Sequence, residues 1–272
     1  MRKLGVLLTF IFFIGALIAG YIHWNAKVEK TVSRNIDVSV SDEPSDSLAN
    51  QNNSNGNTFT ISRDELKELV MGLPEPVSNQ FLTHYEKGEP LDIIIVGSPA
   101  LASETNGWSV QVKEHLEELY GDDFLKMTIV EFDGTSTEFV DSEEAASVVE
   151  AKPDIVFFEP LTLEDNGLVE IDTSHENIKT FMERILAENP EAVLILQPPH
   201  PIHAAVYYPR QVEALAEFAE EEGIPYFDHW PNWPDPDSDE ITNYLNEDGF
   251  PNENGHKIWA DAVINYFTGK NK

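Results

Sequence analysis

The chain has 272 residues, of which 41% are hydrophobic and 10% aromatic, so it can bury a sizeable core in one or two domains. The chain has 17 Lys and Arg residues and 49 Asp and Glu residues, which gives a formal net charge of −32. This acidity argues against a nucleic-acid partner, because phosphate binding needs basic patches. The complete lack of cysteine excludes disulfides, thiolate catalysis and metal sites built on cysteine.

The first 26 residues differ in composition from the rest of the chain. Arg2 and Lys3 precede an uncharged run of 19 residues from Leu4 to Ile22. As a helix, with a rise of about 1.5 Å per residue, this run spans roughly 28 Å, close to one hydrocarbon core. We therefore expect residues 1–26 to anchor the protein in the cell membrane as a single pass, with the C-terminal domain outside the cytoplasm. A cleaved signal segment, which would make the protein secreted, is the alternative.

Residues 27–58 are polar and rich in Ser, Asn and Asp, with the stretch LANQNNSNGN at 48–57. Such a segment has too few large apolar residues to offset its chain entropy. We expect a flexible linker here, followed by a folded domain over residues 59–272.

Within this domain, segments typical of strands alternate with segments typical of helices. Ser62 and Glu65 form a capping-box pattern, as do Thr173 and Glu176. In chain order, helices are expected near 62–71, 80–86, 108–120, 138–150, 173–186, 206–222 and 252–267, and strands near 91–97, 126–132, 154–159, 192–197 and 224–227. This alternation predicts an α/β fold: a three-layer α/β/α sandwich with a mostly parallel five-stranded sheet of the flavodoxin-like kind.

In parallel sheets of this kind, functional residues gather where the strands end. The predicted strands end in GSPAL (97–101), DGTS (133–136), EPLTLEDNG (159–167), QPPHPIH (197–203) and DHW (228–230), and NEDGFPNENGH (246–256) precedes the last helix. This succession resembles the SGNH/GDSL hydrolase family over roughly residues 90–268. The resemblance implies an α/β/α sandwich that cleaves or transfers acyl esters.

The same resemblance assigns roles to residues. Ser98 takes the place of the nucleophilic serine, and its backbone N–H and that of Gly134 take the place of oxyanion donors. The stretch PNENGH resembles the family's final block. Within and before it, we choose His256 as the candidate base and Asp248 as the candidate acid, which are not roles that the resemblance itself assigns. A helix N-terminus disfavours the protonated form of a histidine, which suits a base, but His256 also lies at a spacing that allows it to pack inward.

Three departures from the family pattern stand out. The aspartate of G-D-S-L is absent, because Gly97 directly precedes Ser98. Glu164 stands where the family has an oxyanion-binding Asn, and Asn166, two residues on, is the expected substitute if the loop shifts register. Phe250 occupies the position of the catalytic histidine, so a triad needs another one: His256, or alternatively His200 or His203.

Two functions follow from these residues. The first is a membrane-tethered serine esterase, acyl hydrolase or acyltransferase, outside the cytoplasm, acting on an ester of a cell-surface polymer or small molecule. The second is a catalytically inactive relative that binds a cell-surface glycan or peptide, with aromatic side chains for stacking at Tyr207, Tyr208, Trp230 and Trp233. No cofactor is expected, and Pro201 inside His200-x-x-His203 makes a metal site there unfavourable.

Overall fold

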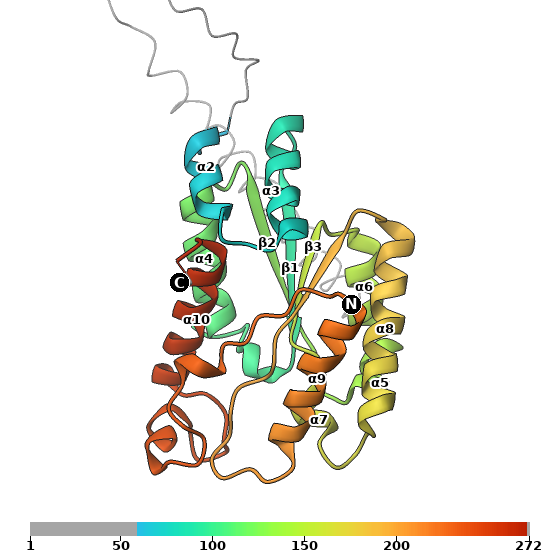
Figure 1. The fold of residues 1–272 in the computed structure, drawn as a ribbon, viewed down its shortest axis with the longest axis vertical. Coiled ribbons are helices and arrows are strands. Elements are labelled where there is room, and N and C mark those ends of the chain that lie inside the picture. The colour runs from blue at the N-terminus through green and yellow to red at the C-terminus, as the bar shows by residue number, and fades with distance from the viewer. Residues whose placement is uncertain (1–58, 271–272) are drawn as a thin grey trace, which may run out of the picture. The chain divides into compact units, whose positions relative to one another are not determined.

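The computed structural model describes residues 59–270 (Figure 1). The expected anchor at 1–26 and linker at 27–58 lie outside the described residues. Within 59–270, no helix combines the length and the apolar character needed to cross a bilayer.

A parallel sheet forms the middle layer of the domain. Its four strands run in the order β2-β1-β3-β4, and every neighbouring pair is parallel. The near-continuous apolar runs in β1, β3 and β4 form strands because both faces of the sheet are covered. The strands are β1 (Leu91–Gly97), β2 (Leu125–Glu131), β3 (Ile155–Phe158) and β4 (Val193–Leu196).

The prediction of a fifth strand at 224–227 is wrong. This segment runs beside β4 but pairs with it only at a single parallel bridge between Leu196 and Tyr226. Two hydrogen bonds hold it, from Leu196 N–H to the Pro225 carbonyl (2.9 Å) and from Phe227 N–H to the Leu196 carbonyl (2.8 Å). Pairing stops there because Pro225 has no N–H to donate, and neither has Pro198, which follows β4 closely.

Helices cover both faces of the sheet, as the sequence predicts (Figure 1). One face carries α2 (Arg63–Val70), α3 (Glu75–Lys87), α4 (Trp108–Tyr120) and α10 (Glu253–Phe267). The other carries α5 (Ser136–Val140), α6 (Glu143–Ala151), α8 (Ile171–Glu188) and α9 (Tyr208–Glu222). In β1, Ile93 and Ile95 join the first core cluster and Ile94 and Val96 the second, because successive side chains of a strand point to opposite faces.

Local capping decides where several helices begin. The capping box of Ser62 and Glu65 opens α2 as predicted. The box predicted at Thr173 is wrong: α8 already begins at Ile171, after Glu170, so Thr173 lies within its first turn. Thr135 caps α5 and Ser142 caps α6, which splits the single helix expected over 138–150 into two.

Candidate active site

Ser98 lies directly beyond β1, where the short 3-10 helix η1 (Pro99–Leu101) begins. Its Oγ accepts a hydrogen bond from Ala100 N–H (3.2 Å) and so caps this turn. Ser98 also donates twice to one carboxylate oxygen: its N–H and its Oγ–H lie 2.9 Å and 2.8 Å from Glu159 Oε2. The side chain expected to act as nucleophile is therefore 2% exposed and held by a glutamate.

Glu159 follows β3, the strand next to β1, and is completely buried. Its Oε2 receives both donors of Ser98, whereas Oε1 has no partner among the described residues. Burial raises the pKa of Glu159 to about 8, with a further increase from the negative charge of Glu164, although the two bonds from Ser98 act in the opposite direction. This carboxyl group therefore changes its charge close to neutral pH.

Gly97 makes the contact between Ser98 and Glu159 possible. A Cβ atom on residue 97 would lie 2.7 Å from Glu159 Oε2 and 2.9 Å from Glu159 Cβ. Any other amino acid here would push the glutamate away from the serine. The glycine before the candidate nucleophile is thus a requirement of packing.

The loop after β3 contains the four-residue helix α7 (Thr162–Asp165). Glu164 on this helix is half-buried, and burial raises its pKa to about 7, with Asp133 and Asp165 adding to the shift. Asn166 ends the helix and is exposed. Of the two residues predicted for this position, Glu164 is the one whose charge acts on Glu159.

Gly134 lies three residues beyond Glu131, which pairs with Gly97 across β1 and β2. A Cβ atom at this position would lie 2.8 Å from the ring of Phe132. In the part of the chain that the structure describes, the Gly134 N–H donates to no protein group. This N–H therefore has the free hydrogen that an oxyanion donor needs.

His256 and Asp248 do not form a hydrogen-bonded triad with Ser98 over residues 59–270. His256 lies in the first turn of α10, and its Nδ1 accepts a hydrogen bond from Trp108 N–H (3.3 Å). Burial lowers the pKa of His256, so the ring is neutral at pH 7. Asp248 is exposed, and its backbone N–H donates to Asn246 Oδ1 (2.9 Å).

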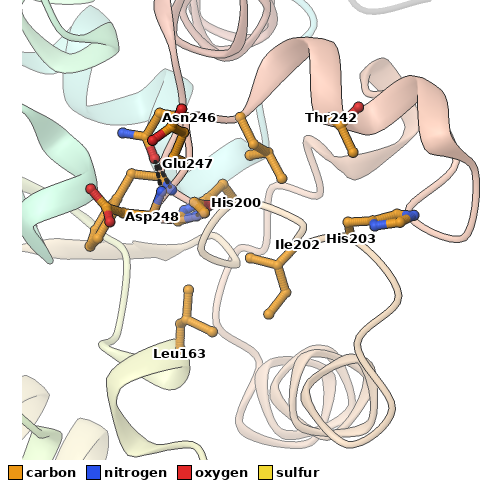
Figure 2. A pocket seen from close by; sticks show the side chains of 11 residues that line it. Leu163, His200, Ile202, His203, Thr242, Asn246, Glu247 and Asp248 are labelled. Atoms are coloured by element: carbon orange, nitrogen blue, oxygen red, sulfur yellow. Dashed lines mark hydrogen bonds between the residues drawn. The ribbon is translucent and has the colours of Figure 1, made fainter.

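A pocket of about 520 Å³ opens beside this region, and Asp248 lies on its wall. Figure 2 shows Leu163 of α7 directed toward His200 and Ile202 across the pocket. His200 itself is buried, and its Nε2–H donates to the Gly249 carbonyl (3.0 Å), while Nδ1 has no partner among the described residues. Burial lowers the pKa of His200 to about 4. The ring centroids of Phe250 and His200 lie 6.0 Å apart, so the two side chains are neighbours in the structure.

The remaining histidines near these strand ends have structural contacts. His203 is exposed and lies 3.5 Å from Asp239. His229 is buried, accepts from Trp233 Nε1–H at Nδ1 (2.8 Å) and donates from Nε2 to the Pro198 carbonyl (2.8 Å). Across 59–270, no three His, Asp or Glu side chains are grouped as metal ligands.

The stacking surface predicted for the binding alternative is not formed as a unit. Tyr208 and Trp233 are buried, Trp230 is half-buried, and only Tyr207 is largely exposed. Tyr208 donates from its hydroxyl to the His200 carbonyl (3.0 Å), so it supports the pocket wall from within.

Comparison with known proteins identifies the fold. No protein-family model matches the sequence, and no curated protein matches it. Among solved structures, a carbohydrate esterase of family 3 from Talaromyces cellulolyticus superposes with a TM-score of 0.54 at 16% identity, covering 64% of this chain and 94% of that one. An acetylxylan esterase from Geobacillus stearothermophilus gives 0.53 at 15% identity, covering 65% and 94%. A protein assigned to the G-D-S-L lipolytic family from Desulfitobacterium hafniense gives 0.52 at 17% identity, covering 64% and 98%.

These likenesses confirm the coarser prediction of an α/β fold with a parallel sheet, although the sheet has four strands and not five. Residues of this chain form an α/β domain with a parallel sheet of the SGNH/GDSL hydrolase type. At 15–17% identity, these matches show the fold alone. The chemistry depends on the side chains at the strand ends of this chain.

Proposed function

We propose that this protein is a serine ester hydrolase or acyltransferase with Ser98 as its nucleophile. The observation that carries the proposal is the direct hydrogen bond from Ser98 Oγ to a buried carboxylate, at the carboxyl edge of a sheet with this fold. The fold neighbours named as an acetylxylan esterase and a carbohydrate esterase support the choice of ester chemistry.

In this proposal, Ser98 Oγ attacks the acyl carbon and the Gly134 N–H stabilises the oxygen on which negative charge develops. Asn166 and the Ser98 N–H complete the set of predicted oxyanion donors. The predicted triad of Ser98, His256 and Asp248 stays a prediction, because it requires a rearrangement that brings an imidazole nitrogen to Ser98.

Substrate access requires movement, since Ser98 is 2% exposed and does not line the pocket. We propose that α7 moves: Leu163 lines the pocket, while the charge of its neighbour Glu164 acts on Glu159. Leu161, which precedes α7, has a φ of +29°, a strained conformation for a residue with a side chain. Release of this strain would favour an open position of the helix.

We propose a substrate class from the size and charge of the pocket. A volume of about 520 Å³ fits one acyl or sugar-sized group, as in a small ester or a decorated surface polymer. Glu247 and Asp248 on its wall, together with the net charge of −32, repel anionic substrates. We therefore propose neutral or cationic esters.

Ser98→Ala tests the proposal. We expect the turnover of p-nitrophenyl acetate to fall at least about 1,000-fold, because no other group supplies the attacking oxygen. The matched control is Ser174→Ala, another buried serine, in α8, which should keep wild-type turnover. Equal turnover of Ser98→Ala and the wild type would contradict the proposal.

A binding function is the second candidate, and one observation favours it. Both donors of Ser98 are engaged by Glu159 and the serine is buried, so the site is closed to an ester in this conformation. A relative without catalysis would then bind a glycan or peptide in the pocket beside α7. Wild-type protein that shows no esterase activity but binds such a ligand would support this function.

The proposed location is the outer face of a cell membrane, with residues 1–26 as the anchor. Full-length protein should sediment with membranes, whereas a chain of residues 59–272 should stay in the supernatant as a folded domain, because residues 59–270 contain two extensive core clusters. Mature protein that begins after residue 21 and appears in the medium would instead indicate a cleaved signal segment.

A further inference from the structure

We infer that Glu159, and not a histidine, is the general base that takes the proton of Ser98 Oγ. The inference rests on the proposed function and adds a catalytic residue to it. It also accounts for Phe250 at the position of the family's histidine, since a base within reach of the serine makes that histidine unnecessary.

The geometry around Ser98 carries the inference. A general base must lie within hydrogen-bond distance of the proton that it removes, and Glu159 Oε2 lies 2.8 Å from Ser98 Oγ. None of the three candidate histidines, His200, His203 and His256, has a hydrogen bond to Ser98 over residues 59–270. His256 Nδ1 already accepts from Trp108 N–H, and the free Nδ1 of His200 is enclosed without a partner.

Two other sites in the chain show what burial contributes. The same pair of hydrogen bonds occurs in two capping boxes. The backbone N–H and the hydroxyl of Ser62 both donate to one carboxylate oxygen of Glu65, and those of Thr135 both donate to one of Glu138. Glu65 and Glu138 are exposed, and the hydrogen bonds lower the pKa of both. Glu159 makes the same bonds, but burial raises its pKa to about 8. Burial therefore makes Glu159 a stronger base than the two exposed glutamates that accept the same pair of hydrogen bonds.

The charged and titratable groups that face Glu159 act in the same direction. Glu164 on α7 and Glu131 at the end of β2 each raise its pKa through their negative charge. Tyr208 on α9 also faces it, and burial raises the pKa of this phenol, so it stays neutral. Because like charges surround Glu159, taking up a proton relieves repulsion at the moment when Ser98 attacks.

The proposed reaction balances with an ester and water alone. The Oγ–H bond of Ser98 breaks as Oγ bonds to the acyl carbon, and Glu159 takes the proton. The bond to the alcohol then breaks, and the alcohol leaves with the proton from Glu159. Water next attacks the acyl-enzyme and gives its proton to Glu159, the bond from the acyl carbon to Oγ breaks, and Oγ regains a proton.

Proton transfer also frees an oxyanion donor. In the structure, Ser98 N–H donates to Glu159 Oε2, so a substrate oxygen must compete with this carboxylate. A protonated carboxyl group is a weaker acceptor than an ionised one. Once Glu159 holds the proton, Ser98 N–H can turn to the oxyanion.

Glu159→Gln is the direct test, because glutamine keeps the shape and an accepting oxygen but cannot act as a base. We expect the turnover of p-nitrophenyl acetate to fall at least about 100-fold while the thermal unfolding midpoint stays close to that of the wild type. The matched control is Glu65→Gln, which changes the same pair of hydrogen bonds at an exposed capping box and should keep full activity.

The pH dependence of the wild type provides a second test that needs no variant of Glu159. The base works only when deprotonated, so kcat/KM should rise with pH, with the midpoint of the rise near pH 8. Glu164→Gln removes a negative charge beside Glu159 and should move this rise to lower pH. His200 or His256 as the base would place the rise below pH 6.5 instead, because burial lowers the pKa of both.

The outcomes separate this inference from the proposed function. If Ser98→Ala is inactive while Glu159→Gln keeps or raises activity, the esterase stands, and Glu159 is a block on the oxyanion position and not a base. If wild-type protein has no esterase activity under any condition, the proposed function fails. Should Glu159→Gln fail to fold, a wild-type profile that rises below pH 6.5 and is unmoved in Glu164→Gln overturns the inference.

Discussion

Gly97→Ala is expected to reduce esterase activity at least about 100-fold, as much as loss of the general base itself. The added Cβ would lie 2.7 Å from Glu159 Oε2 and 2.9 Å from Glu159 Cβ, closer than side chains tolerate. The glutamate must withdraw, which breaks both of its bonds to Ser98. Overpacking at this buried strand end should also lower the free energy of unfolding by about 1–3 kcal/mol. Steady-state kinetics and a urea titration measure the two effects.

Gly223→Ala separates the loss of stability from the loss of the site. Gly223 ends α9 with a φ of +67°, and nothing lies within 4 Å of an added Cβ. An alanine is strained in this left-handed backbone conformation, so the substitution should lower the free energy of unfolding by about 1 kcal/mol without a change in turnover. If Gly97→Ala keeps its activity, Glu159 is not held against Ser98 by the packing described.

Trp259→Ala is expected to lower the free energy of unfolding by about 3–5 kcal/mol. This fully buried ring stacks between Trp108, at 4.6 Å between ring centroids, and His229, at 4.4 Å. Its Nε1–H donates to Gln197 Oε1 (3.0 Å), which loses a partner when the indole is removed. The substitution therefore leaves both a cavity and an unpaired buried amide.

Tyr207→Ala is the control for removing a large aromatic side chain. Tyr207 is 69% exposed before α9, so its loss should change the free energy of unfolding by less than about 0.5 kcal/mol. Urea titrations of both variants measure the difference. Similar small changes in the two would mean that the stacked rings do not stabilise the domain.

Most of the fold could be predicted because the strands and helices have strong local patterns. The run LDIIIVG forms β1 with the predicted bounds, and Trp108–Tyr120 forms α4 with the predicted bounds. The fifth strand could not be predicted correctly from hydrophobicity, because Pro225 limits how the backbone pairs. The start of α8 was misplaced since Thr173 has capping chemistry but lies inside a helix that begins at Ile171.

The candidate site was only partly predictable, because its key contact joins residues 61 positions apart. Ser98 could be singled out by its place at the end of the first strand. Glu159 carries no motif of its own. The signal that could have found it is topological: β1 and β3 are neighbours in this sheet order, so the residues directly beyond them meet. The sequence could not tell whether Glu164 or Asn166 approaches the site, since the register of α7 depends on its packing.

The most direct test of Ser98 as the nucleophile is mass spectrometry of the protein after reaction with a fluorophosphonate, which modifies only an activated serine. We predict one adduct, on the peptide that contains Ser98, formed at least about 100-fold more slowly in Glu159→Gln. Labelling of Ser98 at the same rate in both proteins would contradict the role of Glu159. An esterase-active protein that carries no adduct on Ser98 would show that Ser98 is not its nucleophile.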